Sequence, residues 1–364
     1  YLGILLSYNS KTFDKNSSDL IKINPTKVDN DKIKISFYGA GNYATATLIP
    51  LMKDSGKVSF NGLVTSTGMS AQSVAKKFDF NYCASSYKEI LNDKNDVVAI
   101  TTRHDTHSKA ICDALAANKN VYVEKPLALS ISELEDINKA YTDNAKSQIM
   151  VGFNRRFAPA TNEIIQHFES VKSPLVINIR VNAGFIPADH WTQDAQEGGG
   201  RMIGEGCHFI DLASAITKSN VKTIYAVGSS KEEKSALLND NLCLSLTFEN
   251  GSIANITYTA DGSKAMSKEH IEVFGGGRSA QIKDFKEISL FDGDKKVKDK
   301  KLGSQDKGQK SMIDSWLKGI QNGEPCIDYN SLMQTSLATI LSIESLSIGM
   351  PLDVDSKLYK IKSS

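Results

Sequence analysis

The spacing of hydrophobic residues changes character near residue 154, and this change divides the chain. Before it, short apolar runs alternate with segments whose apolar residues recur three and four positions apart. These two patterns are typical of buried strands and amphipathic helices. After it, several segments alternate strictly between apolar and polar residues, which is typical of strands with one packed face and one open face. We therefore expect an α/β fold with two sheets of different kinds.

The first half predicts a doubly wound parallel sheet of roughly six strands. Residues 97–101 form a continuous apolar run of the kind that is buried on both faces of such a sheet. The predicted strands are 33–38, 58–65, 81–83, 97–101, 121–123 and 148–152. Helical segments separate them, as expected for a Rossmann domain.

The second half predicts an open, mainly antiparallel sheet in a C-terminal α/β domain. Strict alternation occurs in 175–182, 242–248 and 254–258. Predicted helices span 159–168 and 201–215, and two more close the chain, each with an apolar stripe at helical spacing. We interpret two polar stretches, 262–267 and the Lys-rich 293–309, as solvated loops.

Three segments follow from these patterns. Residues 33–153 form the predicted doubly wound domain, and residues 154–364 form the predicted C-terminal α/β domain. In residues 1–32, a short apolar run of strand character precedes a polar stretch rich in Asn, Asp, Lys and Ser. We interpret residues 1–32 as the end of an upstream module and a linker.

The composition excludes several functional classes. The chain has 364 residues, 40% hydrophobic content and a formal net charge of +1. This charge balance does not favour nucleic acid as a partner, and no apolar run is long enough to span a membrane. The five cysteines are scattered without a metal-binding pattern, so we expect no metal site and a reducing, cytoplasmic location.

A glycine turn follows the first predicted strand, and a helix from Asn42 to about Lys53 follows the turn. We expect Gly39 to form the tight turn and Gly41 to let backbone N–H groups approach a pyrophosphate. The helix N-terminus would favour its negative charge. The predicted cofactor contacts here are Gly39, Gly41, Asn42, Tyr43 and Ala44. The alternative is a plain glycine-rich turn.

Two other clusters follow predicted strands of the same sheet. Ligands of open α/β sheets bind outside the carboxyl ends of the strands, so these clusters should meet the glycine turn. The expected cofactor contacts are Thr101, Thr102, Arg103, His104, His107, Glu124, Lys125 and Pro126. Lys125 could hydrogen-bond a substrate hydroxyl or shuttle its proton. The alternative is a surface lysine at a turn.

A glycine-rich run leads to a second chemical cluster. Gly198, Gly199 and Gly200 precede His208 and Asp211, which lie three positions apart on a predicted helix and so share a face. A histidine can take a hydroxyl proton while hydride leaves the same carbon, and Asp211 could orient the imidazole. The alternative is a structural histidine.

Taken in this order, the Gly39-Ala-Gly41 turn, the Glu124-Lys-Pro126 segment and the glycine block with His208 resemble the Gfo/Idh/MocA oxidoreductase family. The resemblance spans about residue 33 to the C-terminus. It implies NAD(P)-dependent hydride transfer at a sugar or polyol carbon, with Lys125 as the catalytic lysine and His208 as the acid/base histidine. It also implies oligomerisation through the C-terminal sheet.

Two segments, 152–159 and 204–211, resemble a branch in which this module follows a zinc-dependent alcohol dehydrogenase-like module. Tyr1–Tyr8 resembles the final strand of that upstream module. There are also departures from the family pattern. Many members carry Asp or Asn where this chain has Gly204, and whether Glu205 takes over that role is open.

The cofactor and substrate classes rest on a few side chains. No acidic residue ends the second strand; Ser66 and Thr67 stand there instead, and their hydroxyls could hold a 2′-phosphate or tolerate NAD, so we lean toward NADP. Arg155 and Arg156 would suit an anionic substrate, unless they form a surface ion pair. Trp191 could stack on a sugar ring or simply pack. The predicted substrate contacts are Arg155, Arg156, Trp191, Glu205 and Asp211.

We therefore predict an oxidoreductase that acts on a hydroxyl or keto carbon of a sugar, sugar acid, nucleotide sugar or polyol. One alternative is a non-catalytic cofactor or sugar sensor, since fold does not determine function. Another is an enzyme that oxidises one sugar and reduces another without releasing its nucleotide.

Overall fold

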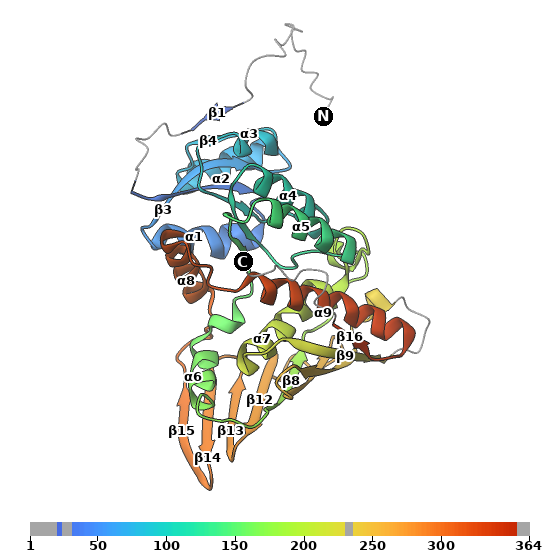
Figure 1. Cartoon of the computed structure of the whole chain (residues 1–364). Helices are drawn as coiled ribbons and strands as arrows, with labels where there is room; N and C mark the ends of the chain where they lie inside the picture. Colours follow the sequence, from blue (N-terminus) through green and yellow to red (C-terminus); the bar gives the residue numbers. More distant parts are fainter. Residues whose placement is uncertain (1–19, 24–30, 230–235, 355–364) are drawn as a thin grey trace, which may run out of the picture.

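The computed structural model describes residues 20–23, 31–229 and 236–354, and the predicted strand within Tyr1–Tyr8 lies outside them. Two sheets organise the described chain (Figure 1). The upper one in the figure is built from the first half of the sequence, and the lower one is built from the second half. The expected α/β fold with two unlike sheets is confirmed.

The first sheet has the strand order of a Rossmann fold. Its parallel strands are β2 (Ile33–Tyr38), β3 (Val58–Val64), β4 (Tyr82–Cys83), β5 (Val97–Ile100), β6 (Asn120–Val123) and β7 (Ile149–Val151). They lie in the order β4-β3-β2-β5-β6-β7. All four residues of β5 are buried, as the apolar run predicted.

Helices alternate with these strands along the chain. They are α1 (Ile49–Asp54), α2 (Gly68–Phe78), α3 (Tyr87–Leu91), α4 (His107–Ala116) and α5 (Ile131–Asp143), with a short 3₁₀ turn η2 (His104–Thr106) before α4. The helical run after the glycine turn continues through Pro50. A π-turn, η1 (Ala44–Leu48), precedes α1 and places Pro50 in the first turn of α1, where its missing N–H costs nothing.

The stretch that we expected to be only a connector contributes one short strand. This strand, β1 (Ile21–Lys22), pairs antiparallel with β4 and extends the edge of the first sheet. The polar residues around Ile21 and Lys22 gave no strand pattern, although the two residues pair with the edge strand β4.

Within the described residues the second sheet has nine strands, and one parallel pair (β8 with β11) interrupts an otherwise antiparallel order. The order is β15-β14-β13-β12-β8-β11-β10-β9-β16. The strands are β8 (Val176–Asn182), β9 (Val221–Gly228), β10 (Leu242–Phe248), β11 (Ile253–Thr259), β12 (Glu269–Gly275), β13 (Arg278–Lys283), β14 (Glu287–Asp292), β15 (Lys295–Lys301) and β16 (Leu352–Asp353).

The expected Lys-rich loop at 293–309 is wrong in its first part, because β15 occupies Lys295–Lys301. Six of its seven residues are exposed, and β15 forms the outer edge of the sheet. Lysines on an edge strand discourage pairing with other chains, so a polar sequence is compatible with a strand here.

Helices cover one face of the second sheet (Figure 1). They are α6 (Pro159–His167), α7 (Cys207–Thr217) and α9 (Tyr329–Ile348). Another helix of this half, α8 (Gln309–Asn322), lies beside α1 instead (Figure 1). The short turns are η3 (Arg155–Phe157), η4 (Trp191–Gln193), η5 (Met202–Gly206) and η6 (Ala236–Leu238). Besides packing on β9, α9 contacts α5, and α8 contacts α1. The end of the chain therefore ties the second sheet back to the Rossmann half.

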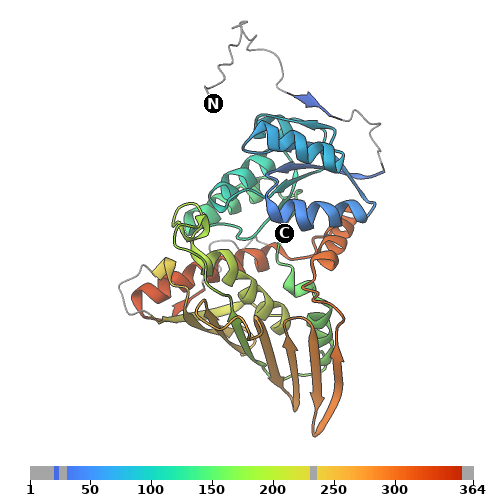
Figure 2. The ribbon, with the colours of Figure 1, turned by 180° about the vertical axis from the view of Figure 1, so that it is seen from behind.

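The strands of the second sheet lie in front of these helices in the opposite view (Figure 2). Three exposed apolar side chains lie on neighbouring strands of this sheet: Val176 of β8, Ile253 of β11 and Phe274 of β12. They are adjacent because both Ile253 and Phe274 pair with Val176. Among the described residues, no helix has the length and hydropathy needed to cross a membrane.

Candidate active site

The ends of four neighbouring strands bring the predicted clusters together. Gly39 follows β2, Thr101 follows β5, Glu124 follows β6 and Gly152 follows β7. Backbone bonds join adjacent ends: the N–H of Thr101 donates to Tyr38, that of Glu124 to Ile100 and that of Gly152 to Val123. The expectation that the three clusters meet at one edge of the sheet is confirmed.

The glycine turn is shaped by a close backbone approach. Gly39 has a φ of +95°, and a Cβ there would lie 2.6 Å from the carbonyl carbon of Thr101. The Thr101 hydroxyl in turn donates to the carbonyl of Gly39 at 2.9 Å. Around a Cβ placed on Gly41, in contrast, nothing lies within 4 Å. Asn42 and Tyr43 are exposed and Ala44 is buried, so the turn offers free backbone beside a small helix start, which fits a dinucleotide pyrophosphate.

Hydroxyl groups collect where β3 meets α2. The Thr65 and Thr67 hydroxyls lie 2.8 and 2.7 Å from that of Ser70, and Ser66 beside them is exposed. The sequence has no carboxylate between Thr65 and Ser70. The place where a ribose-binding acid would stand therefore carries only hydroxyls.

Lys125 crosses from the first sheet to the second half of the chain. Its ammonium group donates to the carbonyl oxygen of Gly204 in η5 at 2.9 Å. An ammonium group has three donors, so this bond leaves two for a ligand. The preceding residue, Glu124, accepts a hydrogen bond of 2.7 Å from the Tyr122 hydroxyl. Burial raises the pKa of Glu124.

His107 holds the two loops on either side of it. Its side chain is fully buried, with Nδ1 2.7 Å from the Pro126 carbonyl oxygen and Nε2 3.3 Å from that of Thr102. Burial lowers the pKa of His107 to about 4, so the ring is neutral and its single N–H serves the shorter contact. We expected a direct cofactor contact from His107; its buried side chain corrects this, because it can only position the loops.

His208 is the second residue of α7, four positions after Gly204. It is buried, and its Nδ1 atom has no hydrogen-bond partner in the part of the chain that the structure describes. Burial is the main reason why its pKa lies well below 6.5. Four nearby cations act in the same direction: Arg155, Lys125, Lys307 and Lys268. His208 is therefore a neutral imidazole in a cationic environment.

Asp211 does not orient His208, which corrects that expectation. Both of its carboxylate oxygens accept hydrogen bonds from Arg156, with Nη2 and Nε at 2.5 and 3.0 Å. The Asp211 side chain is only 1% exposed, so it cannot reach a substrate. Arg156 thus forms an internal ion pair with Asp211 through Nε and Nη2.

Arg155 is also committed to an internal pair. Its Nε and Nη2 atoms donate to the two oxygens of Glu269 at 2.8 and 2.9 Å. Lys307 adds a third bond to Glu269 at 2.6 Å, and Arg155 is 6% exposed. Although burial opposes it, these two cations hold the pKa of Glu269 at about 2. The expected substrate contact from Arg155 is thus corrected to a buried structural ion pair.

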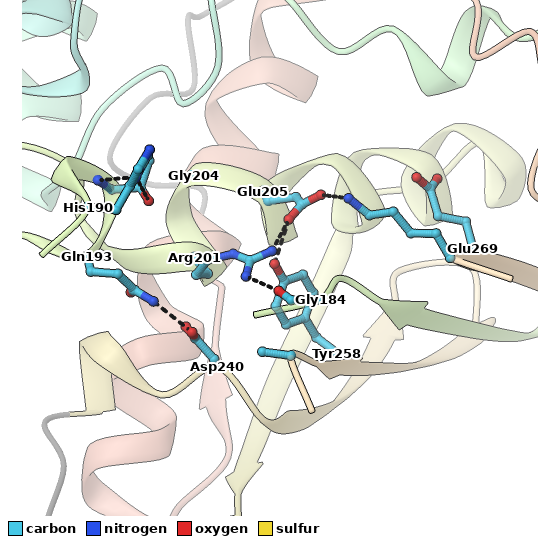
Figure 3. A network of polar contacts seen from close by, with 12 residues as sticks. Gly184, His190, Gln193, Arg201, Gly204, Glu205, Asp240, Tyr258 and Glu269 are labelled. Atoms are coloured by element: carbon cyan, nitrogen blue, oxygen red, sulfur yellow. Dashed lines mark hydrogen bonds and ion pairs between the residues drawn. The ribbon is translucent and has the colours of Figure 1, made fainter. Parts of the chain in front are cut away.

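Glu205 lies at the centre of a polar network (Figure 3). Its carboxylate accepts bonds from Arg201 at 2.8 Å, Lys268 at 2.7 Å and the Tyr258 hydroxyl at 2.6 Å. Burial alone would raise the pKa of Glu205, but Lys268 and the other donors bring it below its usual value. Arg201 also donates to the Gly184 carbonyl oxygen at 2.7 Å.

Trp191 lies on the loop that reaches from the second half of the chain toward η2. Its ring packs edge-on against His104 at 4.8 Å between centroids, and the Arg103 guanidinium lies over it at 5.6 Å. Arg103 also pairs with Glu197 of the same loop. These contacts support the packing interpretation of Trp191, and they place Arg103 against the loop.

Sequence reasoning missed several residues at this site. Two of them, Lys268 and Lys307, lie near His208, and the third, Glu269, bonds Lys307. They come from the start of a strand and from a polar stretch without a motif. Only their three-dimensional neighbours reveal them. Among the described residues, no group of three or more His, Cys, Asp or Glu side chains could hold a metal ion.

Two family models match the chain. One, "Oxidoreductase family, NAD-binding Rossmann fold", matches residues 33–153, and the other, "GFO/IDH/MocA C-terminal domain", matches residues 173–280. An uncharacterized oxidoreductase, YrbE of Bacillus subtilis, is 26% identical over 78% of this chain and 86% of its own length. Inositol 2-dehydrogenase of Salmonella typhimurium is 32% identical over 38% of this chain and 40% of its own.

Solved structures share the fold. A levoglucosan dehydrogenase in complex with NADH and levoglucosan superposes with a TM-score of 0.77 at 18% identity, covering 89% of this chain and 99% of its own. With both family models matched in order along the chain, this protein belongs to the Gfo/Idh/MocA family of oxidoreductases and carries an NAD-binding Rossmann domain.

Proposed function

We propose that this protein transfers hydride between a nicotinamide cofactor and a hydroxyl-bearing carbon of a sugar or polyol, with Lys125 and His208 as its catalytic residues. The observation that carries the proposal is the bond from Lys125 to Gly204. It brings an ammonium group from the dinucleotide-binding half to the helical segment that carries His208. A bound nicotinamide would supply the hydride chemistry; the side chains described here would manage the substrate oxygen and its proton.

The two remaining donors of Lys125 would bind the oxygen that changes between hydroxyl and carbonyl. His208 is uncharged at neutral pH and could accept the hydroxyl proton during oxidation. The cations around it would stabilise negative charge on that oxygen as the proton leaves. Lys268 would contribute to this field, and Glu205 would hold it in place.

We further propose that the enzyme accepts NADP. The support is the hydroxyl cluster of Thr65, Thr67 and Ser70 at the start of α2, where a carboxylate would repel a 2′-phosphate. Titration of the protein with NADH and NADPH, followed by cofactor fluorescence, tests this point. Binding of NADPH no weaker than NADH is expected, and a clear preference for NADH would contradict it.

The substrate class that we propose rests on the names of relatives and on the internal pairing of two arginines. The names of two relatives point to inositol and levoglucosan, both rich in neighbouring hydroxyls. Because Arg155 and Arg156 are paired internally, we no longer assign an anionic group to them. A neutral polyol or sugar is the substrate class that we propose.

Replacement of Lys125 by Ala tests the catalytic proposal. Turnover of a polyol panel, followed as NAD(P)H absorbance, should fall by about 10²–10⁴-fold, because general acid–base groups contribute on that scale. Cofactor affinity should change little. The matched control is Lys109→Ala, the same change at an exposed position of α4. Turnover close to wild type in the Lys125 variant would reject the assignment.

We also propose self-association through the outer face of the second sheet. The row of Ile253, Val176 and Phe274 exposes apolar surface on three adjacent strands. Such a face is commonly covered in oligomers. The fusion to an upstream alcohol dehydrogenase-like module and the cytoplasmic location stay predictions.

A further inference from the structure

The imidazole of His104 occupies the space in which a side chain at position 204 would lie. A Cβ built on Gly204 would be 3.0 Å from Cε1 of His104, which is closer than ordinary packing allows. His104 comes from η2 after β5 of the first sheet, whereas Gly204 belongs to η5 in the second half of the chain. The missing side chain at 204 and the bulky one at 104 therefore fit together across the two halves.

The hydrogen bonds of His104 determine which nitrogen is free. Nδ1 lies 2.7 Å from the carbonyl oxygen of Gly198, and a carbonyl only accepts, so Nδ1 carries the proton. Burial, with help from the Lys125 charge, lowers the pKa of His104 to about 3, so the ring is neutral at physiological pH. Nε2 must then present a lone pair, which makes it a hydrogen-bond acceptor.

This acceptor is open to a ligand. Within the described ranges, Nε2 of His104 has no hydrogen-bond partner, and it is not one of the fully buried polar atoms that lack one. It therefore keeps contact with solvent. The ring edge rests on Gly204, and the same glycine accepts the hydrogen bond of Lys125. The donor of Lys125 and the imidazole that carries the acceptor Nε2 thus both lie against one small residue, Gly204.

We propose that Nε2 of His104 accepts a hydrogen bond from a second hydroxyl of the substrate, next to the hydroxyl that Lys125 binds. The site would then select vicinal diols, with one oxygen on Lys125 and the neighbouring O–H directed at His104. This inference rests on the proposed function for the identity of the reacting hydroxyl. It also explains why His104 is held rigidly by Gly198 and by Trp191, because a specificity contact needs a fixed position.

Two variants separate the proposed contact from a purely structural role. His104→Asn keeps an N–H near the position of Nδ1, so it can still bond Gly198, but it has no atom at the position of Nε2. His104→Gln extends an amide oxygen toward that position. His190→Ala is the matched control, because His190 is an exposed histidine on the neighbouring loop.

The experiment measures polyol affinity in the whole 364-residue chain with NADH or NADPH bound, by calorimetry with myo-inositol and levoglucosan as probes. Turnover is measured on the same panel. Loss of one hydrogen bond in a buried site should weaken polyol affinity roughly tenfold in His104→Asn, with cofactor affinity and melting temperature unchanged. Partial recovery is expected in His104→Gln, and no change in His190→Ala.

A deoxy substrate gives the sharpest comparison. The 2-deoxy analogue of a bound sugar lacks one partner of a vicinal pair, so wild type should bind the parent sugar roughly tenfold better than the analogue, and His104→Asn should bind both alike. Wild-type polyol affinity in His104→Asn, or no polyol binding by the wild type, would overturn the inference. His104-dependent binding without turnover would reject the proposed redox function and leave this site standing.

Discussion

Replacement of Glu269 by Gln should destabilise the fold, because it leaves the buried Arg155 and the half-buried Lys307 without a neutralising charge. The change keeps the volume of the side chain but removes the charge that neutralises Arg155 and Lys307. Glu269 is fully buried and accepts three bonds from these residues, at 2.6 to 2.9 Å. Gln cannot compensate two positive charges, so the folded state should lose stability.

The magnitude can be worked out in two ways. Arg155 and Lys307 lower the pKa of Glu269 from 4.5 to about 2 against the effect of burial, and a gap of that size corresponds to about 3 kcal/mol at neutral pH. Removal of one partner from a buried ion pair typically costs about 3–5 kcal/mol. Both routes predict a loss of about 3 kcal/mol or more in the free energy of unfolding.

Urea denaturation followed by tryptophan fluorescence measures this loss. The pKa of Glu269 is depressed in the folded state, so its stabilisation is complete above pH 4.5 and disappears as the pH falls from 4.5 toward 2. The difference between wild type and variant should therefore be constant from pH 7.5 to 5.5 and shrink below pH 4.5. Asp314→Asn, the same change in the exposed pair with Lys310 on α8, is the control and should have little effect. A loss below about 1 kcal/mol at pH 7 would refute the reasoning.

Three further predictions test the fold and the site. Gly39→Ala should weaken NAD(P)H binding at least tenfold, measured by fluorescence titration, whereas Gly56→Ala, also at positive φ but in open space, should not. The free energy of unfolding of His107→Asn should depend less on acid pH than that of wild type. Because the pKa of His107 is depressed in the folded state, wild type loses stability as the pH falls from 6.5 toward 4. Between pH 6.5 and 5, urea titrations should show that wild type loses about 1.5 kcal/mol more than the variant. Phe274→Lys should lower the molar mass found by light scattering if the outer sheet face associates, and an unchanged mass would count against that interface.

The parts of the fold that the sequence predicted well depend on local rules. Apolar runs identified the buried strands of the first sheet, and the Gly39-Ala-Gly41 pattern correctly placed a turn between β2 and the helix that follows it. The meeting of the glycine turn, Thr101 and Glu124 also follows from local rules, because parallel strands end at a common edge. The sequence analysis missed β12, β13 and β14, although buried and more exposed residues largely alternate in them. It assigned β15 to a loop because this edge strand is lysine-rich and has no buried face.

Charged residues near the site were assigned less well, for a physical reason. Arg155 pairs with a residue 114 positions away, and Arg156 with one 55 positions away. The sequence around an arginine does not show whether its side chain is free to bind a ligand or is paired with a carboxylate. Only the tertiary fold decides whether a carboxylate arrives to neutralise it, and burying the charge without one would cost several kcal/mol.

Gly204 shows how a departure from a family pattern can be understood only from both halves of the chain. Considered within its own segment, a glycine in place of Asp or Asn looks like the loss of a functional group. The structure places the His104 ring against it at 3.0 Å from its would-be Cβ and the Lys125 ammonium on its carbonyl. A Cβ at position 204 would approach the His104 ring more closely than ordinary packing, independently of the hydrogen bond from Lys125. The glycine at 204 and the imidazole of His104 are thus one arrangement. Gly204→Ala should destabilise the folded protein more than the addition of one methyl group suggests. A second change, His104→Ala, should relieve this destabilisation.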